Sequence, residues 1–599
     1  MKICKKTKIF FKIFVFFCFF FKYEFARGLY ETKAYPLIHM MNNNDFIGSS
    51  IHSLKNNIIN LLFLYKDIKF KENYSTIDEL ADLQDETKIE RLIREKVQYI
   101  NKFVNKRQLI KFSGFIYLYE IINENNIYFL MHFIMTNNNN GIVIILPNNS
   151  YIDTNEFFRI NKIKECENIT AEKLEKRILF FQSLILNLKL NQSIYFIKND
   201  EEIEYIYDNY KSKFGYFDLT RNISVQISKS QNIYKLNSKN LFFFLSKDNI
   251  NINSIFNKQQ NNETFILTKK KTIIICVDYN VFNVVSDFSS HTTSTNSSII
   301  AVIELIKLFS EVYKNEDVNY NILFFFTNYY YGISNFIDNI NSTFKDSIEF
   351  VVCLDNLNES EFYIHETKKD QPHHILRFYE ILKQIIKINI KKDIKMETQK
   401  IKIHNKHLPK THEYFVLKNF PSFSLSSKNR TVTFLNRTPI IEQKLKKDNL
   451  KNHIKNIFES IYIYIKDYEE KLDEEKIQNE LSYYTNLIKS DAMTDLNENL
   501  NKYNKFFIYK EDTMKLFNYL KIIMNHYIND SNFLIKDYKI PHDKKQKFFY
   551  QKYVNIAFSM TISYIFHYIH FLFVSLFLII TYLLVNFYFV PSFYKNTIK

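Results

Sequence analysis

The sequence predicts an α/β fold in which helices flank a mostly parallel sheet. The run at 272–277 is typical of a strand buried on both faces of a parallel sheet, and the largely apolar runs at 320–326 and 348–354 predict two more core strands. Between the first two runs, apolar residues recur at helical spacing from 299 to 312, which predicts a helix with one buried face. Strands that alternate with helices favour parallel pairing, because a parallel connection needs a crossover.

Further elements extend this unit in both directions. We predict strands at 141–147, 191–197 and 420–425, and helices at 201–210, 375–388 and 454–465. Residues 228–262 are rich in Asn, Lys and Gln, which predicts a surface insertion around a short strand at 241–245. The charged stretch 466–552 is expected to be helical, and 554–567 to form an interfacial helix.

The composition describes a globular chain with a codon bias. Of the 599 residues, 46% are hydrophobic and 24% are charged, with 6 Gly, 42 Tyr and 59 Phe. Abundant Asn, Ile and Lys indicate an AT-rich genome. Because the same codon bias raises the Lys content, we do not interpret the net charge of +16 as a sign of function. No motif concentrates the Lys residues, so we predict no nucleic-acid partner.

Motifs for other chemistries are missing from the sequence. It contains no CxxC, GxSxG, Walker loop or GxGxxG, which argues against zinc knuckles, serine hydrolases and nucleotide-binding loops. Cys276 and Cys353 lie inside predicted strands, where Cys behaves as a small apolar residue.

Both ends of the chain carry apolar segments. Basic residues followed by a run at 9–21 predict a signal peptide at 1–26, with an uncleaved signal anchor as the alternative. A transmembrane helix is predicted at 568–590, followed by a cytosolic tail at 591–599. The Lys residues before this span favour a cytosolic body, but long domains translocate largely regardless of flanking charge. We therefore predict a single-pass protein whose bulk is lumenal.

The body of the chain is expected to have three parts. These are an N-terminal lumenal region at 27–134, an α/β domain at 135–470 that contains the insertion 228–262, and a helical lumenal region at 471–553. Candidate glycosylation sequons occur at Asn148, Asn168, Asn222, Asn341 and Asn429. Such sequons arise by chance in a chain this rich in Asn, so the sequence permits glycosylation without predicting it.

The order of strands and helices resembles the zinc aminopeptidase-like fold, whose metal ligands follow the carboxyl ends of the strands. A two-zinc site needs His and carboxylate ligands and a Glu as general base. At the corresponding positions this chain has Asp278, Asn280, Thr293, Tyr329, Tyr330, Asp355 and Ser427. Asp355 alone is a ligand type in its expected place, and Tyr cannot replace Glu as a base near neutral pH. We therefore expect no catalytic residue, no metal and no cofactor.

An opposing interpretation is an unorthodox metal site built from His291, Asp278, Asp287 and Asp355. We expect instead that His291 is an exposed loop residue and that Asp355 caps a turn. On this view the peptidase-like core serves for binding and not for hydrolysis.

The residues also resemble nicalin-type members of the nicastrin/nicalin family. The resemblance rests on the order and spacing of the segments 320–325, 348–355, 412–415 and 420–426, and no single motif is specific. Segments 141–147 and 193–202 fit the same pattern, and 278–282 falls where the family has a peptidase remnant. The similarity covers about residues 29–590.

This resemblance implies a non-catalytic subunit of an endoplasmic reticulum membrane complex. Its partners would be a nodal modulator-like lumenal protein, a small multi-pass membrane protein and the Sec translocon, and the complex would assist insertion and assembly of multi-pass membrane proteins. The aromatic stretch 571–589 would contact the multi-pass partner, or else lipid. Two alternatives stay open: a nicastrin-like substrate receptor of an intramembrane protease complex, and an active metallo-aminopeptidase.

Overall fold

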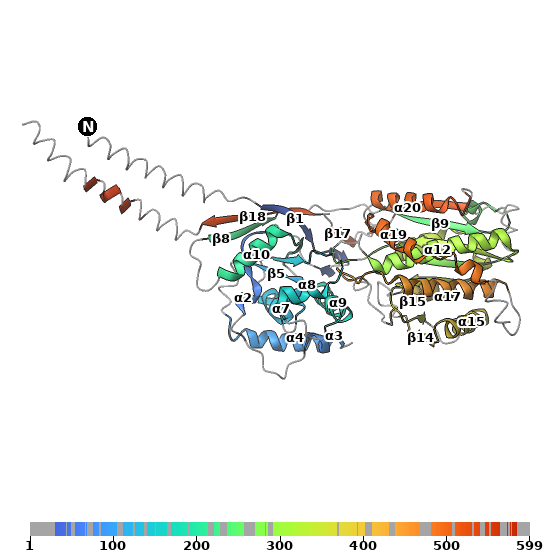
Figure 1. Ribbon diagram of the computed structural model, residues 1–599, viewed down its shortest axis with the longest axis horizontal. Helices are drawn as coiled ribbons and strands as arrows, with labels where there is room; N and C mark the ends of the chain where they lie inside the picture. The colour runs from blue at the N-terminus through green and yellow to red at the C-terminus, as the bar shows by residue number, and fades with distance from the viewer. Residues whose placement is uncertain are drawn as a thin grey trace, which may run out of the picture.

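The chain forms two lobes that follow one another along the long axis of the molecule (Figure 1). The computed structural model describes residues 30–562, apart from internal gaps, and eight residues between 572 and 583. The gaps are 43–44, 49–53, 66–67, 69–75, 83–85, 105–111, 124–125, 137–140, 150, 164–168, 188–191, 214–220, 228–236, 249, 257–269, 282, 286–291, 368–370, 392, 402–409, 430–437, 467–480, 506–509, 530–531, 540–545 and 550–552.

A sheet that closes on itself forms the smaller lobe. Its strand order is β1 (Tyr30–Pro36), β18 (Val554–Ile562), β8 (Arg221–Ile227), β4 (Leu54–Asn60), β5 (Phe112–Tyr117), β6 (Ile142–Leu146) and β7 (Ile194–Lys198), and β7 pairs back with β1. The strands β4 to β7 run parallel, whereas β8, β18 and β1 pair antiparallel. Every residue of β6 is buried, as expected for a strand covered on both faces.

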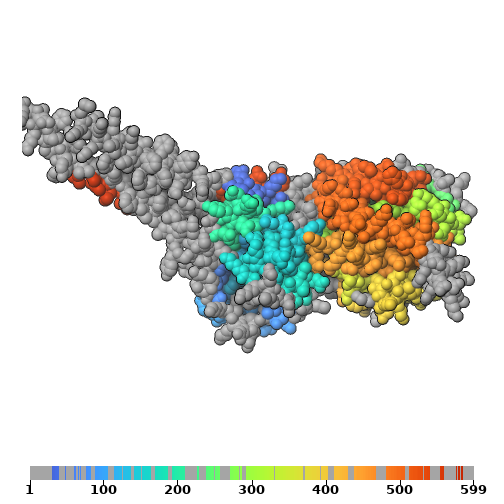
Figure 2. All heavy atoms as spheres, viewed as in Figure 1, coloured from blue at the N-terminus to red at the C-terminus, as the bar shows by residue number. Residues whose placement is uncertain are grey.

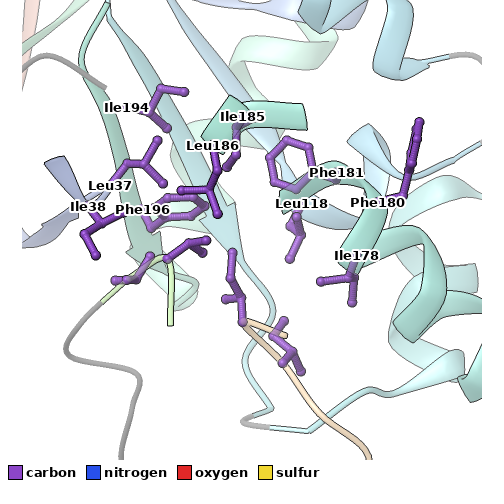
Figure 3. Packing of buried hydrophobic residues seen from close by; sticks show 14 of the residues in the cluster. Leu37, Ile38, Leu118, Ile178, Phe180, Phe181, Ile185, Leu186, Ile194 and Phe196 are labelled. Atoms are coloured by element: carbon purple, nitrogen blue, oxygen red, sulfur yellow. The ribbon is translucent and has the colours of Figure 1, made fainter. Parts of the chain in front are cut away.

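Helices cover both faces of this closed sheet. They are α2 (Leu61–Leu64), α3 (Ile77–Asp82), α4 (Glu86–Ile100), α6 (Leu118–Ile121), α7 (Asn126–Thr136), α8 (Thr154–Asn161), α9 (Ala171–Asn187) and α10 (Glu201–Lys213). Leu186 of α9 packs against Phe196 of β7 on one face (Figure 3). On the other face, Tyr207 of α10 lies in a separate core with Phe115 and Phe558. Each face therefore has its own apolar cluster.

The larger lobe is built on a second sheet. Its order is β14 (Lys395–Thr398), β13 (Tyr363–Glu366), β15 (Ser422–Ser426), β12 (Ile348–Asp355), β10 (Lys271–Asp278), β11 (Tyr320–Thr327), β9 (Asn237–Leu245) and β16 (Phe533–Lys539). Pairing is parallel from β15 through β11 and antiparallel at β9 and β16. The central strands are parallel because strands and helices alternate in the sequence. Each crossover helix brings the chain back to the end of the sheet where the previous strand began.

Helices and short elements surround this sheet. They are η1 (Ile252–Phe256), α12 (Thr293–Asn315), α13 (Tyr329–Asn339), α14 (Ser342–Ser347), α15 (His373–Ile390), α16 (Thr411–Leu417), α17 (Lys447–Ile465), α19 (Ser490–Leu500) and α20 (Lys510–Met524). A small separate sheet joins β17 (Gln546–Phe549), β2 (His39–Asn42) and β3 (Asp45–Gly48).

The two lobes share an extended contact (Figure 2). The backbone N–H of Ile38, just after β1, donates to the carbonyl of Val284 at 2.9 Å. Gln182 of α9 donates to the carbonyl of Thr438 at 3.2 Å and accepts from the N–H of Ile440 at 2.7 Å. Because these amide groups are buried and satisfied across the contact, the lobes are held together by specific bonds as well as by apolar packing.

The structure confirms a mixed α/β fold. The predicted strands at 272–277, 320–326 and 348–354 correspond to β10, β11 and β12, and the helix at 299–312 lies within α12. Cys276 and Cys353 are buried within strands, as predicted, and their free thiols lie on the paired strands β10 and β12.

Strand pairing departs from the sequence prediction in several places. The strands β6 and β7, which a boundary at 135 assigns to the α/β domain, pair within the closed sheet of the smaller lobe. The short strand expected in the insertion is longer, at β9, and is buried between β11 and β16. The stretch 466–552, expected to be helical, also supplies the strands β16 and β17. Apolar periodicity identifies buried strands but does not say which sheet they join.

The C-terminal prediction is partly overturned. Residues 554–562, expected to form an interfacial helix, are the strand β18, because its apolar residues alternate into the core between β1 and β8. Of the predicted span 568–590, the structure describes Leu572, Ser575, Leu576, Leu578, Ile579, Ile580, Tyr582 and Leu583, all helical. Within the described residues, no helix has both the length and the apolar character needed to cross a bilayer. The signal segment 1–26 lies outside the described residues.

Candidate functional site

The candidate site lies at the carboxyl edge of the parallel strands in the larger lobe. Asp278 ends β10, Asp355 ends β12 and Ser427 follows β15 directly. Thr293 begins α12, and Tyr329 with Tyr330 begins α13. The backbone thus brings these predicted positions to one edge, where α/β folds gather their functional groups. The side chains of Tyr329 and Tyr330 lie outside the described residues.

Asp278 is held in a local turn. Its Oδ1 accepts a hydrogen bond from the backbone N–H of Asn280 at 2.9 Å, and both side chains are buried. A short Asp side chain that bonds the backbone two residues on is a common turn device. The carboxylate therefore stabilises the exit from β10.

Asp355 forms a buried ion pair with Lys410. Its Oδ2 lies 2.9 Å from Nζ of Lys410, and the two side chains are 14% and 6% exposed. The ammonium group supplies the positive charge that a carboxylate needs in a buried position. The prediction that Asp355 caps a turn misses this partner, because Lys410 is 55 residues away in the sequence.

Two imidazoles lie close to this ion pair. Nδ1 of His412 is 2.7 Å from Oγ of Ser424, and Nε2 of His365 is 3.0 Å from the carbonyl oxygen of Lys428. Burial, with the Lys410 charge as a further cause, lowers the pKa of His365 to about 3. Burial likewise holds the pKa of His412 well below its usual range. Both rings are therefore neutral at physiological pH.

A buried carboxylate lies at the N-terminus of α12. The Oε2 atom of Glu442 accepts from the N–H of Ser294 at 2.8 Å, and Oε1 accepts from its hydroxyl at 2.6 Å. Helix N-termini favour negative charge, which fits this contact. Burial nevertheless raises the pKa of Glu442 to about 7. Thr293 is buried beside this contact, and its hydroxyl has no hydrogen-bond partner within the described part of the chain.

Neutral side chains fill the edge beyond β11. Nδ2 of Asn240 donates to the carbonyl of Gly332 at 2.8 Å, and Nδ2 of Asn328 donates to Oγ of Ser238 at 2.6 Å. A Cβ atom on Gly332 would lie 2.2 Å from Oγ1 of Thr327, so a larger residue here would force the neighbouring side chains to shift.

Ser427 is also part of the framework. Its hydroxyl donates to the carbonyl of Asn356 at 2.6 Å and accepts from the N–H of Glu359 at 2.9 Å. Asn356 has a φ of 45°, a left-handed conformation that Asn tolerates better than most residues. The hydroxyl therefore stabilises the turn after β12.

The described residues do not assemble a metal centre. Within the ranges described, no group of three or more His, Cys, Asp or Glu side chains is arranged to hold a metal ion. His291 and Asp287, the further members of the unorthodox site, lie outside the described residues. The sequence pattern missed Glu442 and Lys410, because neither belongs to a motif and both reach the edge through tertiary folding.

The candidate sequons differ in accessibility. Asn148 and Asn429 are exposed. Asn341 is buried, and its Nδ2 donates to the carbonyl of Ser254 at 2.8 Å while it caps α14. Asn222 pairs with Thr561 between β8 and β18. Asn168 lies outside the described residues.

Known proteins resemble this chain in part of the sequence and in the overall fold. No protein-family model matches the chain. The BOS complex subunit ncln of Danio rerio is 30% identical over 171 residues, which is 26% of this chain and 30% of that protein. The BOS complex subunit NCLN of Homo sapiens is 29% identical over 173 residues, again 30% of its length. The chain thus matches less than a third of the length of these relatives.

The fold similarity extends over most of the chain. The crystal structure of the gamma-secretase component nicastrin aligns with 88% of this chain and 99% of its own, at a TM-score of 0.50 and 10% identity. This similarity establishes a nicastrin-like fold. A zinc aminopeptidase from Bacillus subtilis aligns with 74% of this chain at a TM-score of 0.30 and 12% identity, and we draw nothing from this weaker match.

Proposed function

We propose that this chain is a non-catalytic, nicalin-like subunit of a membrane complex in the endoplasmic reticulum. The observation that carries the proposal is the 30% identity to a protein named as a BOS complex subunit. The nicastrin-like fold is compatible with it. The role of the whole protein is proposed, because the aligned segment covers 30% of that relative.

The carboxyl edge of the larger sheet supports the non-catalytic part of the proposal. Asp355 is neutralised by Lys410, Glu442 is bound by the N-terminus of α12, and amide groups fill the space beyond β11. Hydrolysis by a two-zinc site requires a Glu base and open coordination positions. These described side chains are instead bonded to one another, which suits a rigid platform for binding.

We further propose a single-pass topology. The segment 1–26 would be the signal peptide, 568–590 the span and 591–599 the cytosolic tail, with the bulk of the chain lumenal. The partners would be a nodal modulator-like lumenal protein, a small multi-pass protein and the Sec translocon. Of the candidate sequons, Asn148 and Asn429 are exposed enough for glycosylation.

The test is purification of the tagged full-length protein in mild detergent, followed by mass spectrometry of what stays bound. We expect Sec channel subunits together with a small multi-pass protein. A matched variant in which Leu, Ile and Val alternate through 571–589 keeps the apolar length and removes the aromatic side chains. Loss of the multi-pass protein from this variant alone would assign that contact to the aromatic surface of the span.

A second function is favoured by the fold similarity to nicastrin over 88% of the chain. A nicastrin-like receptor would retain an intramembrane protease of the presenilin type in the same purification, without Sec channel subunits. That result would replace the proposal.

An active metallo-aminopeptidase makes a different prediction. The purified chain would then contain stoichiometric zinc by elemental analysis and would hydrolyse amino-acid anilides. We expect neither, and the presence of both would overturn the non-catalytic assignment.

A further inference from the structure

The first strand, β1, and the last strand, β18, pair along one side of the smaller lobe. Tyr30, the first residue of β1, pairs with Phe558 of β18, and the rings of these two residues stack at 6.4 Å. The strand β18 continues past this pair to Ile562, which pairs with Arg221 at the start of β8. The start of β1 therefore lies beside the C-terminal half of β18.

This edge is at the far end of the lobe from the larger lobe. The strand β1 runs from Tyr30 towards Ile38, whose N–H bonds to Val284 at the contact between the lobes. Because β18 is antiparallel to β1, it runs away from that contact. At about 3.3 Å per residue, Ile562 lies up to about 40 Å along the strand direction from Ile38. Figure 1 shows β8 and β18 on the side of the smaller lobe that is farthest from α12, α15 and α17.

The sequence limits how far this edge can be from the predicted span. Five residues separate Ile562 from position 568, where the predicted span begins. Even fully extended, such a connection reaches only about 20 Å. Whatever conformation the connection adopts, the end of β18 must lie near the bilayer surface if 568–590 crosses it.

We propose that the edge formed by Tyr30, Phe558 and Ile562 faces the lipid bilayer, and that the larger lobe is held away from it. The inference rests on the proposed membrane anchoring. In this orientation the protein has two separate binding surfaces, one near the membrane and one away from it. The smaller lobe and the span are available to membrane-embedded partners, whereas the larger lobe is presented to lumenal partners.

The start of α10 provides a reporter at the proposed membrane edge. The hydroxyl of Tyr30 donates to Asp200, which directly precedes α10, so this helix begins beside the start of β1. Tyr205 projects from α10 and is 49% exposed. Ile522 of α20 in the larger lobe is 68% exposed. It serves as the control position, far from the proposed membrane edge. Both side chains can be changed without disturbing a core.

The experiment measures energy transfer from a dye on the protein to a dye on lipid headgroups. Tyr205→Cys and Ile522→Cys are introduced separately into the full chain, together with Cys4→Ser, Cys18→Ser and Cys166→Ser to remove three other thiols. Cys276 and Cys353 are buried and should not react. The labelled protein is reconstituted into phosphatidylcholine vesicles that carry acceptor-labelled lipid. We expect several-fold stronger transfer from position 205 than from position 522.

A second variant tests the short connection. Insertion of a flexible Gly/Ser segment of about 20 residues between Ile562 and position 568 would let the edge move roughly 25 Å from the surface. We expect transfer from position 205 to fall in this variant. Equal transfer from both positions, stronger transfer from position 522, or no effect of the insertion would overturn the orientation.

These outcomes are distinct from a failure of the proposed function. Loss of the Sec channel subunits with correct energy transfer would reject the complex and keep the orientation. Release of the chain from membranes by alkaline carbonate would reject both, because the anchoring on which they rest would be absent.

Discussion

The two lobes stabilise buried polar groups at the carboxyl ends of their parallel strands in different ways. In the smaller lobe, tyrosine hydroxyls are the partners: Tyr207 donates to Glu120, and Tyr117 donates to Asn199. In the larger lobe, charged groups and a helix terminus are the partners. Lys410 pairs with Asp355, and the N-terminus of α12 binds Glu442.

The difference lies in the kind of partner that each lobe provides for its buried polar groups. In the larger lobe the buried carboxylates of Asp355 and Glu442 each need compensating positive charge. Here a lysine and a helix terminus supply it. We expect stability to depend much more on the partners in the larger lobe than on those in the smaller lobe.

The largest effect should come from Lys410→Met. This change leaves the Asp355 carboxylate buried without its cation, which typically costs about 3–5 kcal/mol. Thermal unfolding of the detergent-solubilised chain, followed by circular dichroism, measures the loss. The double variant Asp355→Leu with Lys410→Met should recover most of it, since an apolar pair needs no charge partner. A loss below about 1 kcal/mol in the single variant would mean that other groups neutralise Asp355.

The next effect concerns the pH dependence set by Glu442. Its pKa is raised by burial from 4.5 to about 7, so the folded state binds a proton more tightly than the unfolded state. The resulting stabilisation is complete below pH 4.5 and is lost as pH rises towards 7, with a slope of up to about 1.4 kcal/mol per pH unit. Glu442→Gln should flatten this slope in unfolding midpoints measured from pH 5 to 8.

Lys505 gives the opposite slope at higher pH. Burial lowers its pKa from 10.5 to about 7, so the unfolded state binds more protons between these values and stability rises with pH. The charge of Lys428 lowers the pKa of Glu442 and the charge of Glu175 raises it. Lys505→Met should remove the rise above pH 7 and leave the slope below it. If Glu442→Gln changed both slopes equally, the two groups would titrate as one coupled pair.

A smaller effect compares one glycine from each lobe. A Cβ on Gly332 would lie 2.2 Å from Oγ1 of Thr327 and 2.5 Å from Oδ1 of Asn240. Gly332→Ala should therefore cost about 1–3 kcal/mol by overpacking. A Cβ on Gly114 of the smaller lobe would meet Cδ1 of Leu61 at 3.1 Å, which is the flexible end of a side chain. Gly114→Ala should cost less in the same unfolding measurement, and equal losses would show that the polar network at Gly332 can adjust.

These contacts mark the limit of what the sequence could predict. The apolar runs at β10, β11 and β12 were identifiable, because buried parallel strands have a local signature. The positions Asp278 and Asp355 followed from the ends of β10 and β12, and Thr293 followed from its distance before Glu304 in the next helix. Lys410 and Glu442 have no local signature, since their roles depend on neighbours that are distant in sequence. The sheet to which β6 and β7 belong was unpredictable for the same reason.

The smallest effect should come from Tyr117→Phe in the smaller lobe. The change removes one neutral hydrogen bond of 3.1 Å to Asn199, and such bonds contribute about 0.5–1.5 kcal/mol. The group left behind is a neutral amide oxygen, which is far less costly to bury than the unpaired Asp355 carboxylate that Lys410→Met leaves. Adding Asn199→Leu should recover part of the loss, because the second polar group is then removed. If Tyr117→Phe destabilised the chain as much as Lys410→Met in parallel thermal unfolding, charge would not be what separates the two edges.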